Sequence, residues 1–216
     1  MKKSFTLIEL VFVIVVIGIL AAYIIPSTRT NPLQQAAIQL VSHIRYTQYL
    51  AMIDDKFGVS AKWYEERWQI RFTLGSQGSD YKIAYAIFSD SNGNHSTHPE
   101  FNELAKDPLS GLVITGGVTN VVKYTDEGVY SKANLGVTYN IDNITFTSSC
   151  QYYGSMRIAF DHLGRPIKGN IGSPSVTSNI DTLKYIRQRC EISLHSGNES
   201  VTIAIEPETG YTRIII

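Results

Sequence analysis

Hydrophobic positions are distributed unevenly along the chain, and their spacing changes twice. From Phe5 to Ile25 nearly every position is apolar, and residues 11–25 carry no charge. At about 1.5 Å per residue, these 21 residues form a helix roughly 31 Å long, close to the roughly 30 Å hydrocarbon thickness of a bilayer. The first pattern therefore predicts a transmembrane helix.

A second helical pattern covers Leu33–Ile53, after Pro26, which we expect to kink or interrupt the first helix because it lacks an N–H group. Its apolar stripe consists of Ala37, Val41, Ile44 and Ala51, flanked by Leu33, Leu40 and Met52 and interrupted by Gln48. The opposite face carries Gln35, Gln39, Ser42, His43 and Arg45. Such an amphipathic helix is expected to pack on a folded domain.

From residue 62 onward the apolar period becomes two. Trp68, Ile70, Phe72 and Leu74 alternate with Gln69, Arg71 and Thr73, which indicates a half-buried strand. Further strands are expected at 81–88, 111–124, 137–146, 156–160, 191–194, 201–206 and 211–216, between clusters of Gly, Asn, Ser and Pro. Many short strands beside a long helical region indicate an α+β fold.

Charge narrows the list of partners and suggests a topology. The 216 residues include 19 basic and 19 acidic side chains, so the formal net charge is zero. A protein that binds nucleic acid through its phosphates normally carries a basic excess, so nucleic acid is not expected as a direct partner. Lys2 and Lys3 precede the apolar segment, which by the positive-inside rule predicts a cytoplasmic N-terminus and an extracytoplasmic remainder.

Glu9 is the one charged residue between Phe5 and Ile25. A carboxylate in a membrane helix costs about 2.5 to 3.5 kcal/mol at the bilayer centre and less near its edge, so a specific partner is expected. A secretory signal peptide is disfavoured because its apolar core would be about 7 to 15 residues long. A plain membrane anchor fits the length and leaves Glu9 unexplained.

The run Lys-Lys-Ser-Phe-Thr-Leu-Ile-Glu-Leu-Val at residues 2–11, followed by an apolar helix with Pro26, resembles the N-terminus of type IV pilins and type II secretion pseudopilins. The resemblance implies that a prepilin peptidase cuts between Ser4 and Phe5 and methylates the new amino group of Phe5. It also implies that Glu9 neutralises the Phe5 ammonium of a neighbouring subunit and fixes the axial register. Ser4 departs from the family, which nearly always has Gly before the cut.

Trp63, Trp68 and the segments 158–166 and 201–211 resemble H-type minor pseudopilins. The resemblance implies a pilin-like fold, in which one long helix packs with its outer half on an antiparallel β-sheet domain. We expect a leader at residues 1–4, a transmembrane assembly helix at 5–25, its periplasmic half at 26–53 and an extracytoplasmic β-rich domain at 54–216. Residues 75–130 match no known pattern and receive no function.

The function implied is that of a subunit of a pilus-like periplasmic filament in a type II secretion system. Its partners would be other pilin-like subunits, the prepilin peptidase, an inner-membrane assembly platform and membrane lipid. Two alternatives stay open. One is a type IV pilus subunit for adhesion, motility or DNA uptake, and the other is a membrane-anchored binding domain that does not polymerise.

Three further groups of residues were considered as a disulfide, a calcium site and a zinc site. Cys150 and Cys190 are the only cysteines, and an oxidising compartment favours a disulfide between them over two buried thiols. Asp90–Asn94 has the start of a calcium loop but is read as a turn, since Phe101 stands where a bidentate Glu is needed. His95, His98 and Glu100 form only a weak zinc pattern.

Nothing in the sequence indicates catalysis. The remaining histidines, His43, His162 and His195, are scattered and are expected at surface or turn positions. Asp161 and Arg165 are expected to make turn contacts at Gly164. Nucleophile elbows, phosphate loops and metalloprotease motifs do not occur, so we expect no enzyme, no cofactor and no metal site.

Overall fold

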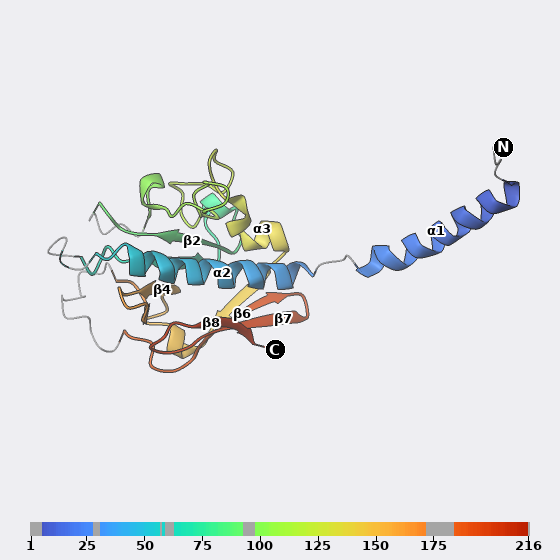
Figure 1. The fold of residues 1–216 in the computed structure, drawn as a ribbon. Helices are drawn as coiled ribbons and strands as arrows, with labels where there is room; N and C mark the ends of the chain where they lie inside the picture. Colours follow the sequence, from blue (N-terminus) through green and yellow to red (C-terminus); the bar gives the residue numbers. More distant parts are fainter. Residues whose placement is uncertain are drawn as a thin grey trace. The chain divides into compact units, whose positions relative to one another are not determined.

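The structure, a computed structural model of the chain, describes residues 6–27, 31–56, 58, 63–92, 98–171 and 184–215, and does not describe the side chains of residues 21–27. The chain divides into two compact units, Met1–Asn31 and Pro32–Ile216 (Figure 1). Each unit is considered by itself below.

Two helices lie within the first 53 positions of the chain. Helix α1 spans Leu7–Ser27 and α2 spans Pro32–Ile53, and Asn31 just before α2 is not helical. Pro32 fits the first turn of α2 because an N–H there has no partner within the helix. The predicted break between the two helical segments covers residues 28–30, which lie outside the described residues. Pro26 is the penultimate residue of α1, and its kink stays a prediction.

The second unit contains two four-stranded antiparallel sheets. The first has the strand order β2-β1-β4-β5 and the second has the order β3-β6-β7-β8. The strands are β1 (Gln69–Thr73), β2 (Ala84–Phe88), β3 (Asn143–Phe146), β4 (Arg157–Phe160), β5 (Pro166–Lys168), β6 (Cys190–Ser196), β7 (Glu199–Ile205) and β8 (Thr212–Ile215). Short helical segments are η1 (Gln77–Ser79), η2 (Phe101–Glu103), η3 (Ser131–Ala133), α3 (Leu135–Tyr139) and η4 (Ser148–Cys150).

Helix α2 contacts both sheets, which share one hydrophobic core with it (Figure 1). Helix α2 contributes Leu40 and Ile44 to this core, and both are fully buried. The first sheet contributes Ile70 of β1, and the second sheet contributes Leu194 of β6. Burial of each such side chain contributes about 1.5 to 3 kcal/mol, so packing rather than helix propensity stabilises α2. The α+β fold expected from the sequence is present.

Part of the predicted strand at 137–146 is wrong. Residues 135–139 form α3, and only Asn143–Phe146 is a strand. The Asn134 side chain accepts a hydrogen bond from the Val137 N–H at 3.0 Å and so caps the helix at its start. Asn140 ends it in the left-handed conformation, with φ of 55°. Both positions favour Asn for these reasons.

The predicted strand at 111–124 is also wrong, although its apolar residues are buried. This part of the chain makes only isolated bridges, such as Ala86 with Thr115. Its backbone nevertheless lies along the outer edge of β2. The Ile87 N–H donates to the Ile114 carbonyl at 3.1 Å, and the Tyr85 carbonyl accepts from Gly116 at 2.8 Å. The segment therefore covers a sheet edge.

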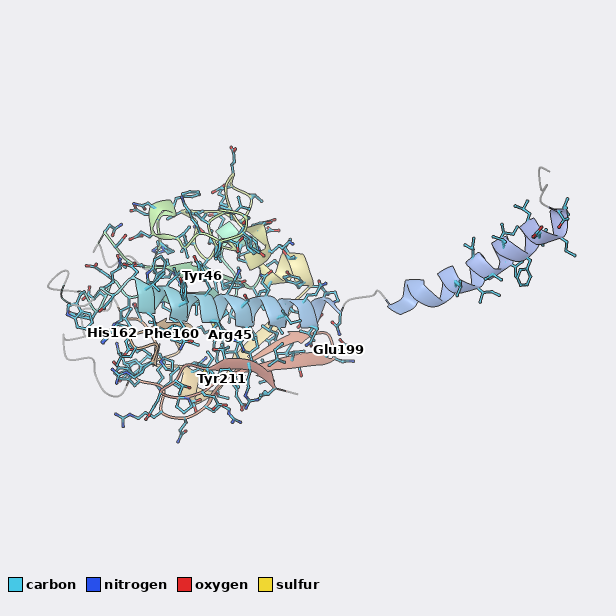
Figure 2. The ribbon with its side chains drawn as sticks, in the orientation of Figure 1. Arg45, Tyr46, Phe160, His162, Glu199 and Tyr211 are labelled. Atoms are coloured by element: carbon cyan, nitrogen blue, oxygen red, sulfur yellow. A yellow bond between two sulfur atoms is a disulfide. The ribbon has the colours of Figure 1, made fainter. Side chains whose placement is uncertain are left out.

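Strand β8 is the last strand of the second sheet, and a side chain of α2 hydrogen-bonds to its backbone. Arg45 donates from Nε and Nη2 to the Thr212 carbonyl, at 2.9 and 2.6 Å. Its guanidinium also lies over the Tyr211 ring, 5.7 Å from the centroid (Figure 2). Arg45 thus contacts the backbone of β8 at Thr212 and the side chain of Tyr211, the residue just before the strand.

Candidate functional site

The N-terminal end of α1 is organised around Thr6 and Glu9. The Thr6 N–H and hydroxyl both face Glu9 Oε2 at 3.4 Å, and the Glu9 N–H faces Thr6 Oγ1 at 3.4 Å. The Leu10 N–H also donates to the Thr6 carbonyl at 3.2 Å. This reciprocal arrangement is a capping box, which satisfies backbone N–H groups that a helix leaves free at its start.

Our sequence interpretation missed the role of Thr6. The signal was present as Thr-x-x-Glu directly before an apolar run. Among the described residues, the carboxylate of Glu9 contacts Thr6 at the start of its own helix. The residue expected to meet a neighbouring ammonium therefore has a local hydrogen-bonding partner in the single chain.

Apart from Glu9, the described surface of α1 is apolar on every side. All side chains from Leu7 to Leu20 are exposed, including Leu7 at 81 % and Phe12 at 69 %. A helix that is apolar all round is normally covered, either by other protein or by lipid. The surface of α1 is therefore one that the N-terminal unit does not cover by itself.

Among the residues that the structure describes, none of the helices combines the length and the hydropathy of a membrane-spanning segment.

Two of the predicted processing residues, Ser4 and Phe5, lie outside the described residues, as does His95 of the loop weighed for zinc. Asp90, the first residue of the loop weighed for calcium, is buried at 4 % exposure. Within the ranges that the structure describes, no group of three or more His, Cys, Asp or Glu residues is placed to hold a metal ion.

Cys150 and Cys190 form a disulfide in the structure. Cys150 ends η4 and Cys190 begins β6, and both residues are fully buried. Neighbouring hydrogen bonds hold the same two segments together, since Ser149 Oγ donates to the Arg189 carbonyl at 2.7 Å. The bridge thus joins segments that already pair.

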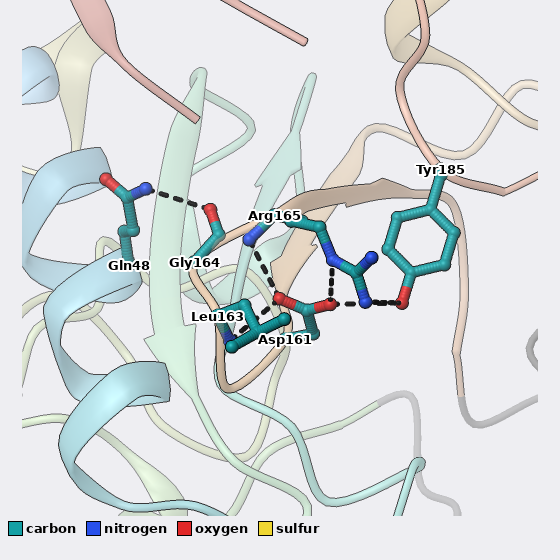
Figure 3. Close-up of polar contacts among 6 residues, drawn as sticks. All are labelled: Gln48, Asp161, Leu163, Gly164, Arg165 and Tyr185. Carbon is teal, nitrogen blue, oxygen red and sulfur yellow. Dashed lines mark hydrogen bonds and ion pairs between the residues drawn. The ribbon is translucent and has the colours of Figure 1, made fainter. Parts of the chain in front are cut away.

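Asp161 organises the turn between β4 and β5, as expected for turn contacts at Gly164 (Figure 3). It is fully buried and accepts hydrogen bonds from the Leu163 N–H at 3.0 Å and the Arg165 N–H at 2.8 Å. Arg165 Nε and the Tyr185 hydroxyl donate to its other oxygen at 2.7 and 3.0 Å. The carboxylate is saturated by these donors, which indicates a structural role.

The turn shaped by Asp161 is also attached to α2. Gln48 Nε2 donates to the Gly164 carbonyl at 2.8 Å (Figure 3) and to the Thr209 carbonyl at 2.8 Å. The first carbonyl belongs to the turn between strands of one sheet, and the second to the turn between β7 and β8 of the other. The predicted polar interruption of the apolar stripe therefore connects both sheets to the helix.

The expectation that His43 lies on the surface is wrong. His43 is only 6 % exposed, and its Nδ1 lies 2.6 Å from the Tyr85 hydroxyl. Gln39 Nε2 donates to the same hydroxyl at 2.7 Å, so the hydroxyl proton is left to donate to His43. The pattern of α2 gave no sign of this cluster, because Tyr85, which accepts from Gln39 and contacts His43, comes from β2.

Burial changes the acid–base properties of this cluster. The pKa of His43 is lowered to about 4, mainly because burial disfavours the charged imidazolium, while the charge of Asp107 acts in the opposite direction. Burial raises the pKa of Tyr85 well above its usual value. Both side chains are therefore neutral at pH 7, as their hydrogen bond requires.

A family model described as the prokaryotic N-terminal methylation motif matches residues 1–25. No curated protein and no solved structure is significantly similar to the chain. The motif supports a type IV pilin-like protein, and it implies processing by a prepilin peptidase and assembly with other pilin subunits in general. It also suggests that the N-terminal region anchors the chain to a membrane.

Proposed function

We propose that the chain is a pseudopilin, most similar to the H-type minor pseudopilins, which assembles through its N-terminal helix into the filament of a type II secretion system. The single observation that carries the proposal is the methylation motif at residues 1–25, which includes Glu9 as the one charge in an apolar helix. In this proposal the chain is a structural subunit rather than an enzyme.

Before assembly, residues 5–25 would anchor the subunit in the inner membrane, with Lys2 and Lys3 in the cytoplasm and the β-domain in the periplasm. The all-round apolar surface of α1 supports this, because lipid would cover it before assembly and neighbouring helices would cover it afterwards. The disulfide between Cys150 and Cys190 is consistent with a periplasmic location.

In this proposal, assembly depends on two charged groups, the new ammonium group of Phe5 and the carboxylate of Glu9. Cleavage after Ser4 would produce an ammonium group on Phe5, and Glu9 of one subunit would exchange its local contacts with Thr6 for the ammonium of a neighbour. Pairing the two charges removes the cost of keeping each one in an apolar surrounding. The contact would fix the axial register of the subunits.

Intact-mass analysis of the protein purified from its own membranes tests the processing step. We expect a chain that begins at methylated Phe5, and a Ser4→Gly variant processed at least as completely as the wild type. A chain that retains Met1 would contradict the proposal and support the membrane-anchored, non-polymerising alternative.

Substitution of Glu9 tests the assembly step. Glu9→Ala is expected to leave the β-domain folded and to reduce incorporation into filaments at least about tenfold, since an unpaired ammonium would remain in an apolar contact. Incorporation can be measured by cross-linking and by the amount of subunit in sheared filaments. Glu127→Ala, which removes an exposed acid of the β-domain, is the matched control. Equal incorporation of both variants would overturn the role of Glu9.

The same motif serves type IV pili, so a pilus subunit for adhesion, motility or DNA uptake is the second candidate. The N-terminal motif is the same in type II secretion pseudopilins and in type IV pilins, so it does not distinguish them. Genes for a secretion ATPase and an outer-membrane secretin next to this gene would favour secretion, whereas genes for pilus retraction would favour a pilus.

A further inference from the structure

Strand β8 forms an open edge of the second sheet. Both edge strands of the first sheet are covered by backbone, β2 by residues 114–116 and β5 by residues 184–186, where the Lys168 N–H donates to the Lys184 carbonyl at 2.8 Å. Among the described strands, β8 pairs only with β7. Its outer edge is therefore a place where a further strand can add.

The hydrogen bonds around β8 show which backbone groups face this edge. In an antiparallel ladder, residues bonded to the partner strand alternate with residues whose N–H and C=O groups point away from it. The Glu206 N–H donates to the Tyr211 carbonyl at 2.9 Å, so this carbonyl points toward β7. By alternation, the groups of Thr212 and Ile214 point to the open edge, and the contact of Arg45 with the Thr212 carbonyl agrees. The N–H and carbonyl of Ile214 have no hydrogen-bonding partner in the part of the chain that the structure describes.

A groove of about 340 Å³ lies beside this edge, between α2 and β8. Its lining residues are Ile38, Val41, Ser42 and Arg45 of α2 and Arg213 and Ile214 of β8. The four α2 residues are three or four positions apart and so share one face of the helix. Ile38 is 56 % exposed, and the Ile214 side chain packs against the main core, on the side of the sheet that faces α2. The groove thus places apolar surface next to unpaired backbone groups.

The charges of the groove favour an anionic occupant. Arg213 is already matched, because it pairs with Glu206 at 3.2 Å. Within the described residues, Arg45 contacts only neutral groups, the Thr212 carbonyl and the Tyr211 ring. Nε and Nη2 of Arg45 make the two hydrogen bonds to that carbonyl, so Nη1 remains available to a carboxylate.

We propose that an extended segment of another protein adds to β8 as an antiparallel strand, with an apolar side chain opposite Ile214 and an acidic side chain two residues later, opposite Thr212. Residues two apart lie on the same face of a strand, so both side chains point toward α2. The apolar side chain lies beside Ile38 and Val41, and the acidic one lies beside Arg45. The site belongs to the second unit and does not rest on the proposed assembly through the N-terminal helix.

A second copy of the chain fits this edge less well. Antiparallel pairing of two β8 strands would bring two Arg45 side chains to one short ladder without adding an acid that matches them. In strand addition, main-chain hydrogen bonds supply affinity and side-chain pockets supply specificity. The partner is therefore defined by a pattern, an apolar residue followed two positions later by an acidic one, in an extended segment.

Isoleucine methyl resonances of the full chain, purified in detergent, test the proposal. The probe is the peptide acetyl-Thr-Thr-Leu-Thr-Glu-Thr-amide. It is expected to shift the Ile38 and Ile214 methyl resonances saturably and to slow hydrogen exchange of the Ile214 N–H, while the fully buried Ile167 of the first sheet is unchanged. The same peptide N-methylated at its leucine cannot donate to the Ile214 carbonyl, and it is expected to bind at least about tenfold more weakly.

A third peptide, with Gln in place of its Glu, tests the role of charge. It is expected to bind the wild type about threefold more weakly than the Glu peptide, and this difference is expected to disappear in Arg45→Gln. Lys123→Gln, which removes an exposed cation elsewhere in the second unit, is expected to retain the difference. An unchanged Ile167 resonance and circular dichroism spectrum establish that each variant is folded.

Four outcomes would overturn the proposal. Equal binding of the N-methylated peptide would exclude strand addition, and the same charge effect in Arg45→Gln would exclude the assigned role of Arg45. A shift of the Ile214 resonance on raising the protein concentration without peptide would show that a second copy occupies the edge. Absence of any shift with the Glu peptide would also contradict it. The comparison of peptides on the wild type needs no variant.

Discussion

At the scale of single residues, the protonation state of His43 affects the stability of the second unit. It is neutral in the folded chain because burial lowers its pKa to about 4. The Tyr85 hydroxyl can donate to Nδ1 only while that nitrogen is unprotonated. Protonation would therefore remove a hydrogen bond and place a charge among Tyr85 and Tyr130.

The resulting pH dependence has a definite sign. Because the folded pKa lies below the unfolded value of about 6.5, the unfolded chain binds more protons between pH 6.5 and 4. The stabilisation is therefore complete above pH 6.5 and is lost as the pH falls toward 4, by about 3 kcal/mol. Chemical denaturation at pH 7 and at pH 4.5 measures this loss.

The control for this prediction is His43→Gln, which keeps a hydrogen-bond acceptor near Tyr85 and cannot titrate. Carboxylates also titrate in this range, so the difference between the two proteins is the informative quantity. We expect the variant to lose less stability than the wild type between pH 7 and 4.5. Equal losses would show that His43 is not the group responsible.

At the scale of elements, α2 is the part that holds both sheets together. It is buried over a wider arc than its apolar stripe predicts, because the two sheets and α3 all contact it. Gln48 adds a polar connection, since its amide donates to the turns at Gly164 and Thr209.

Replacing Gln48 therefore tests whether one side chain couples the two turns. Gln48→Leu is expected to lower the free energy of unfolding by about 1 to 3 kcal/mol, because two carbonyl groups lose a donor. Gln35→Leu, at an exposed position of the same helix, is expected to change it by less than about 0.5 kcal/mol. Denaturant titration of both variants makes the comparison. Similar values would mean that the Gln48 contacts contribute nothing specific.

Features that local sequence patterns determine were predicted correctly, whereas features that depend on contacts with distant residues were not. Strand β1 follows a clean alternation, and its inward residues Ile70 and Phe72 are in the core as predicted. His43 was misplaced because its burial comes from Tyr85 and Tyr130, which are distant in the sequence. Strand β5 was missed because it is only three residues long and begins with Pro166.

The candidate site was more accessible to sequence reasoning than the β-domain was. The methylation motif and Glu9 belong to a contiguous segment, so no knowledge of tertiary contacts was needed to find them. The cross-strand pair of Arg71 in β1 and Arg157 in β4 could not be predicted from a contiguous motif. Arg71 and Arg157 are 86 positions apart in the numbering, and only the register of β1 and β4 places them opposite each other.

At the scale of the whole molecule, the disulfide between Cys150 and Cys190 restrains the unfolded chain more than the folded one. It spans a sequence separation of 40, and β4 and β5 lie inside the closed loop. Since β3 already pairs with β6 in the fold, the bridge mainly removes conformations from the unfolded state.

Removal of the bridge is therefore expected to destabilise the second unit without changing its fold. The double variant Cys150→Ala/Cys190→Ala should unfold with a free energy lower by up to roughly 4 kcal/mol. Denaturant titration measures this difference, and the wild type in reductant should show a similar decrease. An unchanged midpoint in both cases would contradict this account.

The segment at 103–116, which matched no known pattern, has a consequence for solubility. Its backbone occupies hydrogen-bonding groups along the outer edge of β2, including those of Tyr85 and Ile87. An open strand edge is a template on which strands of other molecules can add, leading to aggregation. Detaching this segment from β2 should therefore yield chains that precipitate as their concentration rises, because the strand edge and the apolar side chains that the segment buries, such as Ile114, would both become available to other molecules.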